Sequence, residues 1–152
     1  MGVAANLDDS HINTPKHSYI GVDINTNCKK FEKEGVRIVI GDQSDPAFWA
    51  QFKKDFPEPI DIFLDDGGHT MVMQTTTLQE MFWQVRDGGV YLCEDLHTSY
   101  WPDWGGGYLK DDTMVERSKI LVDAVNAWHA RNGELTVSCV SRGAGLPVNV
   151  SI

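Results

Sequence analysis

Residues 60–69 read Ile60-Asp61-Ile62-Phe63-Leu64-Asp65-Asp66-Gly67-Gly68-His69, a largely apolar run that passes directly into two acids, two glycines and a histidine. The run predicts a strand of a parallel sheet, with its carboxyl end in the acidic loop. A stripe at spacings of three to four residues follows and predicts a helix packed on that sheet; its positions are Val72, Thr75, Leu78, Phe82 and Val85. The helix is expected to stop at Asp87-Gly88-Gly89. The stretch therefore encodes a strand, a loop and a helix.

The same unit recurs along the chain. Apolar runs predict further strands at residues 19–24, 36–40 and 90–93, and a last strand at 135–140. Helices are expected around residues 29–32, from Pro46 after a cap at Ser44 or Asp45, and from about Thr113 to Arg131. The last of these has Val115, Leu121, Val125 and Trp128 as its buried stripe. Alternating strands and helices predict an α/β fold with a Rossmann-like, mostly parallel sheet and flanking helices on both faces.

Composition limits the class of protein. The 152 residues fit one domain, and their formal charge of −9 argues against binding to nucleic acid. Three widely spaced cysteines suggest no disulfide framework, and the chain shows neither a membrane-spanning run nor a signal-peptide core. We therefore expect a cytoplasmic protein with a loose leader at 1–17, a core at 18–140 and an irregular tail at 141–152.

Four of the predicted strands end in acids. The acids are Asp23, Asp42, the pair Asp65-Asp66 and the pair Glu94-Asp95. Carboxyl ends of parallel strands share one edge, so these side chains should converge where such sheets bind ligands. Asp66, Glu94 and Asp95 offer only oxygen ligands, which favours Mg²⁺, Mn²⁺ or Ca²⁺ over zinc. The alternative is that single acids solvate loops or cap helices.

His69 lies three residues after Asp66, across two glycines that permit a tight turn. A neutral imidazole at this place can remove a proton from a hydroxyl whose acidity a bound cation raises. The alternative is a histidine at a helix N-terminus with a structural hydrogen bond. Its position within the acidic loop favours the role of general base.

Four motifs together resemble a known family. The order Asp65-Asp66-Gly67-Gly68-His69, Gly88-Gly89-Val90-Tyr91, Glu94-Asp95-Leu96 and Ser99-Tyr100-Trp101-Pro102 is similar to that of the class I, S-adenosylmethionine (SAM)-dependent and metal-dependent sugar O-methyltransferases of macrolide biosynthesis. The resemblance covers about residues 19 to 137.

The resemblance implies methyl transfer from SAM to a hydroxyl of a sugar or natural-product acceptor. Asp66, Glu94 and Asp95 would hold Mg²⁺, and His69 would be the catalytic base. Asp23 would bind the ribose of SAM, Asp42 and Gln43 would border its adenine, and Asp65 belongs to the same cofactor set. Tyr100 and Trp101 would wall the acceptor site, although aromatic side chains in such loops also serve packing alone.

The sequence departs from the family pattern at both ends. Residues 1–18 contain no first strand with a glycine-rich turn, and the last strands of the family's sheet are not recognisable after about Val140. We expect the chain to correspond to a central part of that fold and, through exposed apolar edges, to form a homo-oligomer. Two alternatives stay open: a non-catalytic remnant or subunit that binds metal or a partner polypeptide, and metal-dependent hydrolysis with His69 activating water.

Overall fold

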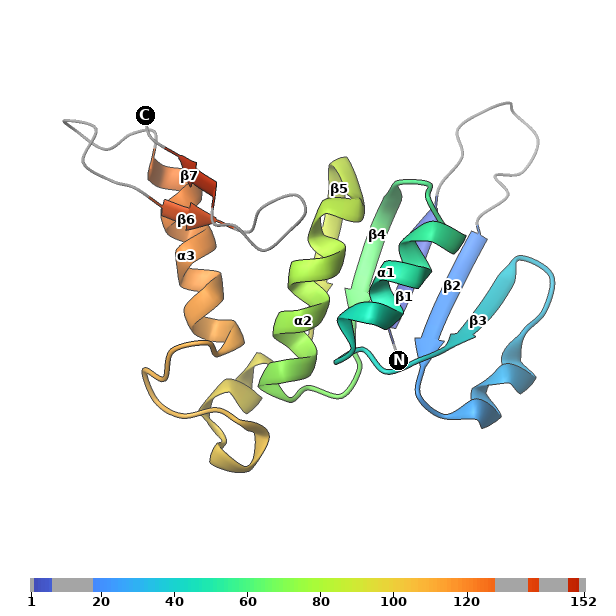
Figure 1. Ribbon diagram of the computed structural model, residues 1–152, viewed down its shortest axis with the longest axis horizontal. Helices are drawn as coiled ribbons and strands as arrows, with labels where there is room; N and C mark the ends of the chain where they lie inside the picture. Colours follow the sequence, from blue (N-terminus) through green and yellow to red (C-terminus); the bar gives the residue numbers. More distant parts are fainter. Residues whose placement is uncertain (1, 7–17, 128–136, 140–147, 151–152) are drawn as a thin grey trace.

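The computed structural model describes residues 2–6, 18–127, 137–139 and 148–150 (Figure 1). Five strands form the main sheet in the order β3-β2-β1-β4-β5. Their bounds are β1 Gly2–Asn6, β2 Ser18–Asp23, β3 Val36–Ile40, β4 Ile60–Asp65 and β5 Val85–Cys93. Strands and helices alternate from β2 to β5, so the α/β, Rossmann-like class expected from the sequence is confirmed.

Four of the five strands run in the same direction. β2 pairs with β3 in parallel, and β4 pairs with β5 in parallel. β1 is antiparallel to both β2 and β4, which makes β2, β3, β4 and β5 parallel to one another. Their carboxyl ends therefore share one edge of the sheet, at the lower side of Figure 1.

The expectation that residues 1–17 form a loose leader is wrong for β1. Gly2–Asn6 lies in the middle of the sheet, where Val3 pairs with both Gly21 of β2 and Leu64 of β4. A gap between β2 and β4 would expose two rows of backbone donors and acceptors, and an inserted strand satisfies both. Its direction is opposite to that of its neighbours, so it is not the parallel first strand of the family pattern. Residues 7–17 lie outside the described part of the chain.

Two helices cover one face of the sheet. α1 Pro46–Asp55 and α2 Met71–Met81 contact each other in front of the strands (Figure 1). Asp45 caps α1 by accepting the N–H of Ala47 at 2.8 Å, and Thr70 caps α2. Both helices begin at the edge where the parallel strands end, because each follows a short loop from such an end.

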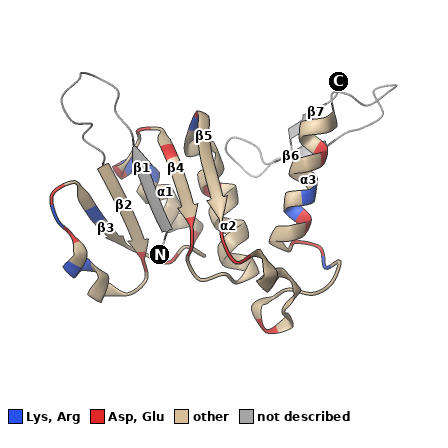
Figure 2. Ribbon diagram, turned by 180° about the vertical axis from the view of Figure 1, so that it is seen from behind, with Lys and Arg blue, Asp and Glu red and all other residues tan. Residues whose placement is uncertain are grey.

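Helices on both faces were expected, and the described residues show this expectation to be wrong. Figure 2 shows the sheet from behind, with no described helix in front of the strands. Tyr19, Ile62 and Val90 point to this face and are exposed. Both α-helices that connect parallel strands, α1 and α2, lie on the opposite face. The remaining connection, from β2 to β3, contains only the short 3-10 helix η1 Thr26–Phe31.

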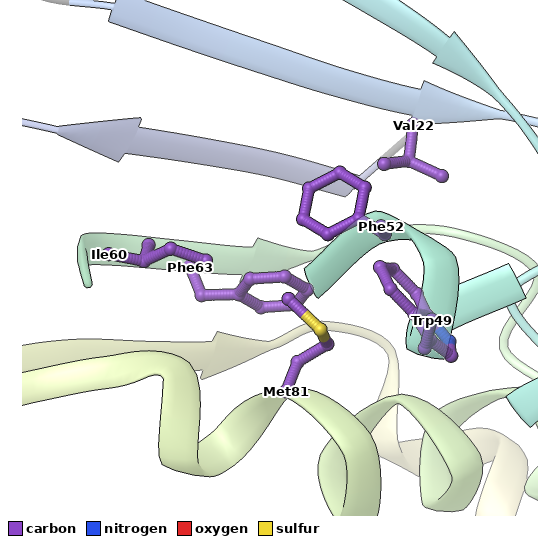
Figure 3. Packing of buried hydrophobic residues seen from close by; sticks show 6 residues of the cluster. All are labelled: Val22, Trp49, Phe52, Ile60, Phe63 and Met81. Carbon is purple, nitrogen blue, oxygen red and sulfur yellow. The ribbon is translucent and has the colours of Figure 1, made fainter. Parts of the chain in front are cut away.

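The main core lies between the sheet and α1. Trp49 and Phe52 of α1 meet Phe63 of β4 and Val22 of β2, and Met81 of α2 closes the cluster (Figure 3). The Trp49 and Phe63 ring centroids are 6.2 Å apart in an edge-to-face arrangement. Each large side chain buried here stabilises the fold by about 1.5–3 kcal/mol. This packing fixes the angle between α1 and the strands that end in acids.

The chain beyond β5 departs in detail from the expectations. α3 spans Met114–Asn126, and its Met114 packs on Met71 and Leu78 of α2. Val125, expected in the buried stripe, is exposed, as is Val72 on α2. Trp128 lies outside the described residues.

The two last strands form a separate sheet. β6 Val137–Cys139 pairs with β7 Val148–Val150 in an antiparallel ladder and takes no part in the main sheet. The strand expected at 135–140 is thus present at its central residues. The expectation of an irregular tail at 141–152 is wrong for residues 148–150, which form β7. Two short antiparallel strands satisfy each other's backbone groups.

No helix in the described part of the chain is long and apolar enough to cross a membrane.

Candidate functional site

The acids predicted for one rim are placed at one edge of the sheet. Asp23 and Asp65 are the last residues of β2 and β4, and Glu94 directly follows β5. Asp42 follows β3 after Gly41, whose amide donates to the carbonyl oxygen of Asp23 at 3.0 Å. The parallel direction of these strands brings together residues far apart in the sequence.

A pocket of about 200 Å³ opens at this edge. All four residues predicted for cofactor binding line it, together with apolar and glycine positions; the lining includes Val22, Asp23, Asp42, Gln43, Phe63, Asp65, Gly67, Gly68 and Met73. Apolar walls with a few convergent polar groups are typical of sites for small organic ligands. Because Gly67 and Gly68 lie between Asp66 and His69, the pocket borders the loop that carries both.

Gln43 connects the loop after β3 to the acidic loop. Its Nε2 donates to Asp65 Oδ1 at 3.1 Å and to Thr77 Oγ1 at 3.2 Å, while its Oε1 accepts the N–H of Gly68 at 2.8 Å. A Cβ on Gly67 would lie 1.7 Å from that Oε1, so a larger residue there would require the amide to move from this position. The side-chain amide of Gln43 thus holds the acidic loop in place, which the sequence did not indicate.

Asp65 is a buried acid on the pocket wall. Burial raises the pKa of its carboxyl above the ordinary value, although hydrogen bonds from Gln43 and from the backbone of Gly67 act in the opposite direction. The Sγ of Cys93 lies 3.8 Å from Asp65 Oδ2. Burial and this neighbouring acid together raise the pKa of the Cys93 thiol to about 12, so the thiol is protonated at neutral pH.

Asp23 and Asp42 each fix a local turn. Asp23 Oδ1 accepts the N–H of Asn25 at 2.8 Å, and Asp42 Oδ1 accepts both the N–H and the hydroxyl of Ser44, at 2.8 and 2.7 Å. The two hydrogen bonds from Ser44 lower the pKa of Asp42. Asp42 is therefore ionised at neutral pH. Both acids accept the hydrogen bonds of a local turn through Oδ1, and both also line the pocket. A structural role in the turn is therefore compatible with a role in binding a ligand.

His69 lies between two of the acids predicted to hold the metal. Its Nε2 is 3.6 Å from Asp66 Oδ1 and 3.5 Å from Asp95 Oδ2. The imidazole is largely buried, with 17% of its side chain exposed, whereas Asp66 and Asp95 are about half exposed, at 45% and 50%. The buried Nδ1 has no hydrogen-bond partner among the described residues. Two carboxylates from different loops therefore flank the Nε2 atom of one imidazole.

His69 and Asp95 both adopt left-handed backbone conformations, each with a φ of 55°. For residues other than glycine such conformations cost about 1 kcal/mol or more and persist only where surrounding contacts hold them. Strain of this kind is concentrated at functional sites.

The third predicted metal ligand, Glu94, is held through its backbone. Its N–H donates to the carbonyl of Asp65 at 2.9 Å, and its carbonyl oxygen accepts Nε2 of the fully buried Gln74 at 2.8 Å. Its carboxylate is exposed. Within the described ranges, no three His, Cys, Asp or Glu side chains are already arranged as a coordination shell.

The donor chemistry of these acids nevertheless fits a hard cation. Asp66, Glu94 and Asp95 come from two adjacent loops, are at least partly exposed, and offer oxygen atoms only. Asp66 and Asp95 already approach each other closely enough to share one imidazole.

An aromatic loop follows the acid pair. It comprises the 3-10 helices η3 Leu96–Tyr100 and η4 Pro102–Trp104. The Trp101 ring lies 4.8 Å from the His97 ring and 5.9 Å from the Trp104 ring, both edge-on. Tyr100 and Trp101 are about half exposed in this loop. They are therefore available to contact a ligand at the rim.

Sequence reasoning missed the buried polar residues that support this site. Gln74 and Thr77 lie on the buried face of α2, and Thr98 lies buried in η3. A signal was present for Gln74, a polar residue four positions before Leu78 on the same helix face. Thr98 had a weaker signal, as a threonine three positions after Asp95.

A parallel sheet with acids and a ligand pocket at its carboxyl edge is the architecture of Rossmann-like methyltransferases, and the comparisons agree. The MycE methyltransferase from the mycinamycin biosynthetic pathway, in complex with Mg, SAH and mycinamycin VI, matches with a TM-score of 0.66 and 33% identity. The match covers 70% of this chain and 30% of that one. A second crystal form with Mg and SAH gives the same TM-score over 80% of this chain.

By sequence, the chain is a relative of the sugar O-methyltransferases of antibiotic biosynthesis. It is 41% identical over 107 residues to the 8-demethyl-8-alpha-L-rhamnosyl tetracenomycin-C 2'-O-methyltransferase of Streptomyces olivaceus. It is 36% identical over 108 residues to the demethylmacrocin O-methyltransferase of Streptomyces fradiae. The two matches cover 70% and 69% of this chain but only 28% and 27% of the relatives. A comparison with models of known protein families finds no match.

Proposed function

We propose that this chain carries the catalytic rim of a SAM-dependent O-methyltransferase that acts on a hydroxyl of a sugar or natural-product acceptor. One observation carries the proposal: a pocket lined by Asp23, Asp42, Gln43 and Asp65 borders the loop in which His69 faces Asp66 and Asp95. A cofactor subsite and a proton-accepting subsite thus share one edge of the sheet. The similarity to MycE, whose structure contains Mg and SAH, supports both assignments.

The cofactors contribute the parts of the reaction that side chains cannot. When bound, SAM supplies an electrophilic methyl group and Mg²⁺ lowers the pKa of an acceptor hydroxyl. Asp66, Glu94 and Asp95 hold the ion through carboxylate oxygens, and Asp23 binds ribose hydroxyls beside Asp42.

His69 would take up the proton of the acceptor hydroxyl at Nε2, and bound SAM would supply the methyl group to the acceptor oxygen, with S-adenosylhomocysteine as the leaving product. The carboxylates of Asp66 and Asp95 would hold the imidazole at the rim, because both lie within 3.6 Å of that nitrogen. Tyr100 and Trp101 contact the acceptor next to Asp95. Holding the reacting groups in line supplies most of the rate enhancement.

A second candidate function has one observation in its favour. β1 runs opposite to its neighbours, so it ends at Asn6, opposite Ser18, at the edge of the sheet away from the pocket. The family pattern places a glycine-rich turn for the methionine half of SAM at the pocket edge. A non-catalytic subunit that binds a divalent ion or a partner polypeptide, without SAM, fits this direction. Under either function, we further propose that the protein is cytoplasmic and forms a homo-oligomer. We also propose that it binds neither nucleic acid nor membrane.

Titration calorimetry separates the two functions. The enzyme hypothesis expects SAM to bind the full chain with one site, and Asp23→Asn to weaken that binding by tenfold or more because a ribose-binding carboxylate is lost. Asp55→Asn, at the far end of α1, is the matched control and should bind SAM normally. Binding of Mg²⁺ without any binding of SAM would favour the non-catalytic subunit.

A further inference from the structure

A buried hydroxyl joins the two loops that carry His69 and Asp95. Thr98 lies in η3, is 2% exposed, and its Oγ1 donates to the backbone carbonyl oxygen of His69 at 2.8 Å. The same Oγ1 lies 2.9 Å from the backbone carbonyl oxygen of Asp95, which also accepts the N–H of Thr98 at 3.2 Å. One side chain therefore connects the loop after β4 to the loop after β5.

Only one of these contacts is expected from local structure. A threonine at the start of a helix commonly bonds a carbonyl three residues earlier, which accounts for the contact with Asp95. The contact with His69 spans 29 positions in the chain. It fixes the carbonyl of the residue whose imidazole lies 3.5 Å from the Asp95 carboxylate. The hydroxyl thus sets the distance between the two backbones from which the facing side chains extend.

The two residues that Thr98 connects both have strained backbone conformations, which surrounding contacts must hold in place. His69 and Asp95 are both left-handed, and a strained conformation relaxes when the contacts around it are removed. Without the hydroxyl, the partly buried carbonyl of His69 loses this donor, and a hydrogen bond to water favours a different loop conformation. The imidazole would then no longer face Asp95 in a single arrangement.

We propose that Thr98 is a positioning residue, which holds the imidazole of His69 opposite the Asp95 carboxylate by tying together the backbones of both residues. The assignment rests on the proposed function of this site. Thr98 is not assigned as a ligand of the ion, because the contacts of its hydroxyl are with the backbone carbonyl oxygens of His69 and Asp95. It acts through His69 and Asp95.

The test compares two substitutions at Thr98 with a control elsewhere. Thr98→Val keeps the shape of the side chain and removes the hydroxyl, whereas Thr98→Ser retains the hydroxyl. Thr75→Val is the control, because the Thr75 hydroxyl is also buried and donates to a backbone carbonyl, that of Met71, at 2.6 Å. It should lower stability without affecting the rim. If Thr98→Val does not fold, Thr98→Ala, which adds no bulk, takes its place.

The first measurement is the affinity of each full-length variant for Mn²⁺, by calorimetry with Mg²⁺ as competitor. Residues that orient metal ligands typically change affinity about 10- to 100-fold when removed. We expect Thr98→Val to bind Mn²⁺ at least about tenfold more weakly, and Thr98→Ser and Thr75→Val to stay within about threefold of the wild type. An affinity of Thr98→Val equal to that of the control would overturn the proposal.

The second measurement needs no ion. Hydrogen exchange detected by mass spectrometry should show that Thr98→Val loses protection in residues 65–70 and 94–101 together, while Thr98→Ser and Thr75→Val keep it in both. Loss in only one of the two segments, or in neither, contradicts the connection. If the wild type binds no Mn²⁺, the proposed metal site fails, and the exchange result alone decides the role of Thr98.

Discussion

The Nε2 atom of His69 lies 3.5 Å from Oδ2 of Asp95, although the two residues follow different strands. The parallel pairing of β4 and β5, with Asp65 opposite Cys93, places the two following loops side by side. A histidine next to a carboxylate at such an edge is an arrangement for proton transfer.

Replacing His69 by alanine should abolish methyl transfer and leave Mg²⁺ affinity nearly intact. The imidazole is assigned to proton removal, which contributes about 10²–10⁴-fold to a rate. The measurement is methyl transfer from labelled SAM to a glycosylated acceptor, with calorimetry of Mg²⁺ on the same preparation. Turnover equal to that of the wild type would remove His69 from the mechanism.

Asp66→Asn and Asp95→Asn should each weaken the binding of Mg²⁺ by tenfold or more, because a neutral amide replaces a charged oxygen ligand. Asp55→Asn, whose carboxylate accepts a hydrogen bond from Gln51 at the end of α1, is the control. Calorimetric titration gives the affinities. The same small loss in all three variants would indicate a change in net charge rather than the loss of a ligand.

Gln43→Leu should destabilise the protein by about 1–3 kcal/mol, because Asp65 and the N–H of Gly68 lose buried hydrogen-bond partners. Gln51→Leu removes an exposed hydrogen bond to Asp55 and should change stability by less than about 0.5 kcal/mol. Urea unfolding followed by tryptophan fluorescence measures both. A Gln43 variant as stable as the Gln51 variant would mean that the acidic loop holds without the amide.

The thiol of Cys93 should react far more slowly than a free thiol. With a pKa of about 12, its thiolate fraction at pH 8 is about a thousandfold below that of an unperturbed cysteine. Alkylation should stay slow as the pH rises through 8 and 9, because the reactive thiolate forms only near the raised pKa. Peptide mass spectrometry after timed alkylation follows Cys93 separately from the other cysteines. Asp65→Asn should speed the reaction, since the Asp65 charge contributes to the shift. Rapid labelling of Cys93 in the wild type would show that the site opens.

Much of the site was predictable from residues next to one another in the chain. Strand ends could be read from apolar runs that finish in acids, as at Asp23 and Asp65, because parallel strands must share a carboxyl edge. His69 was close to Asp66 by sequence alone. The roles of these residues in catalysis and in binding metal and cofactor stay predictions.

Contacts across the fold were not predictable in this way. The amide of Gln43 was expected beside a ligand, yet its hydrogen bonds go to Asp65, Thr77 and Gly68. β1 was missed because five small residues carry little strand signal, and its pairing depends on two rows of backbone groups supplied by β2 and β4.

The sequence by itself determined the alternation of strands and helices from β2 to β5, a cap of α1 at Ser44 or Asp45, and the acids at the ends of these four strands, because these follow from periodicity and local backbone preference. Only the tertiary structure decided that His69 faces Asp95, that Thr98 joins their backbones, and that one face of the sheet carries no described helix. These relationships depend on hydrogen bonds and packing between residues distant in the chain, and their partners become known only when the sheet is assembled.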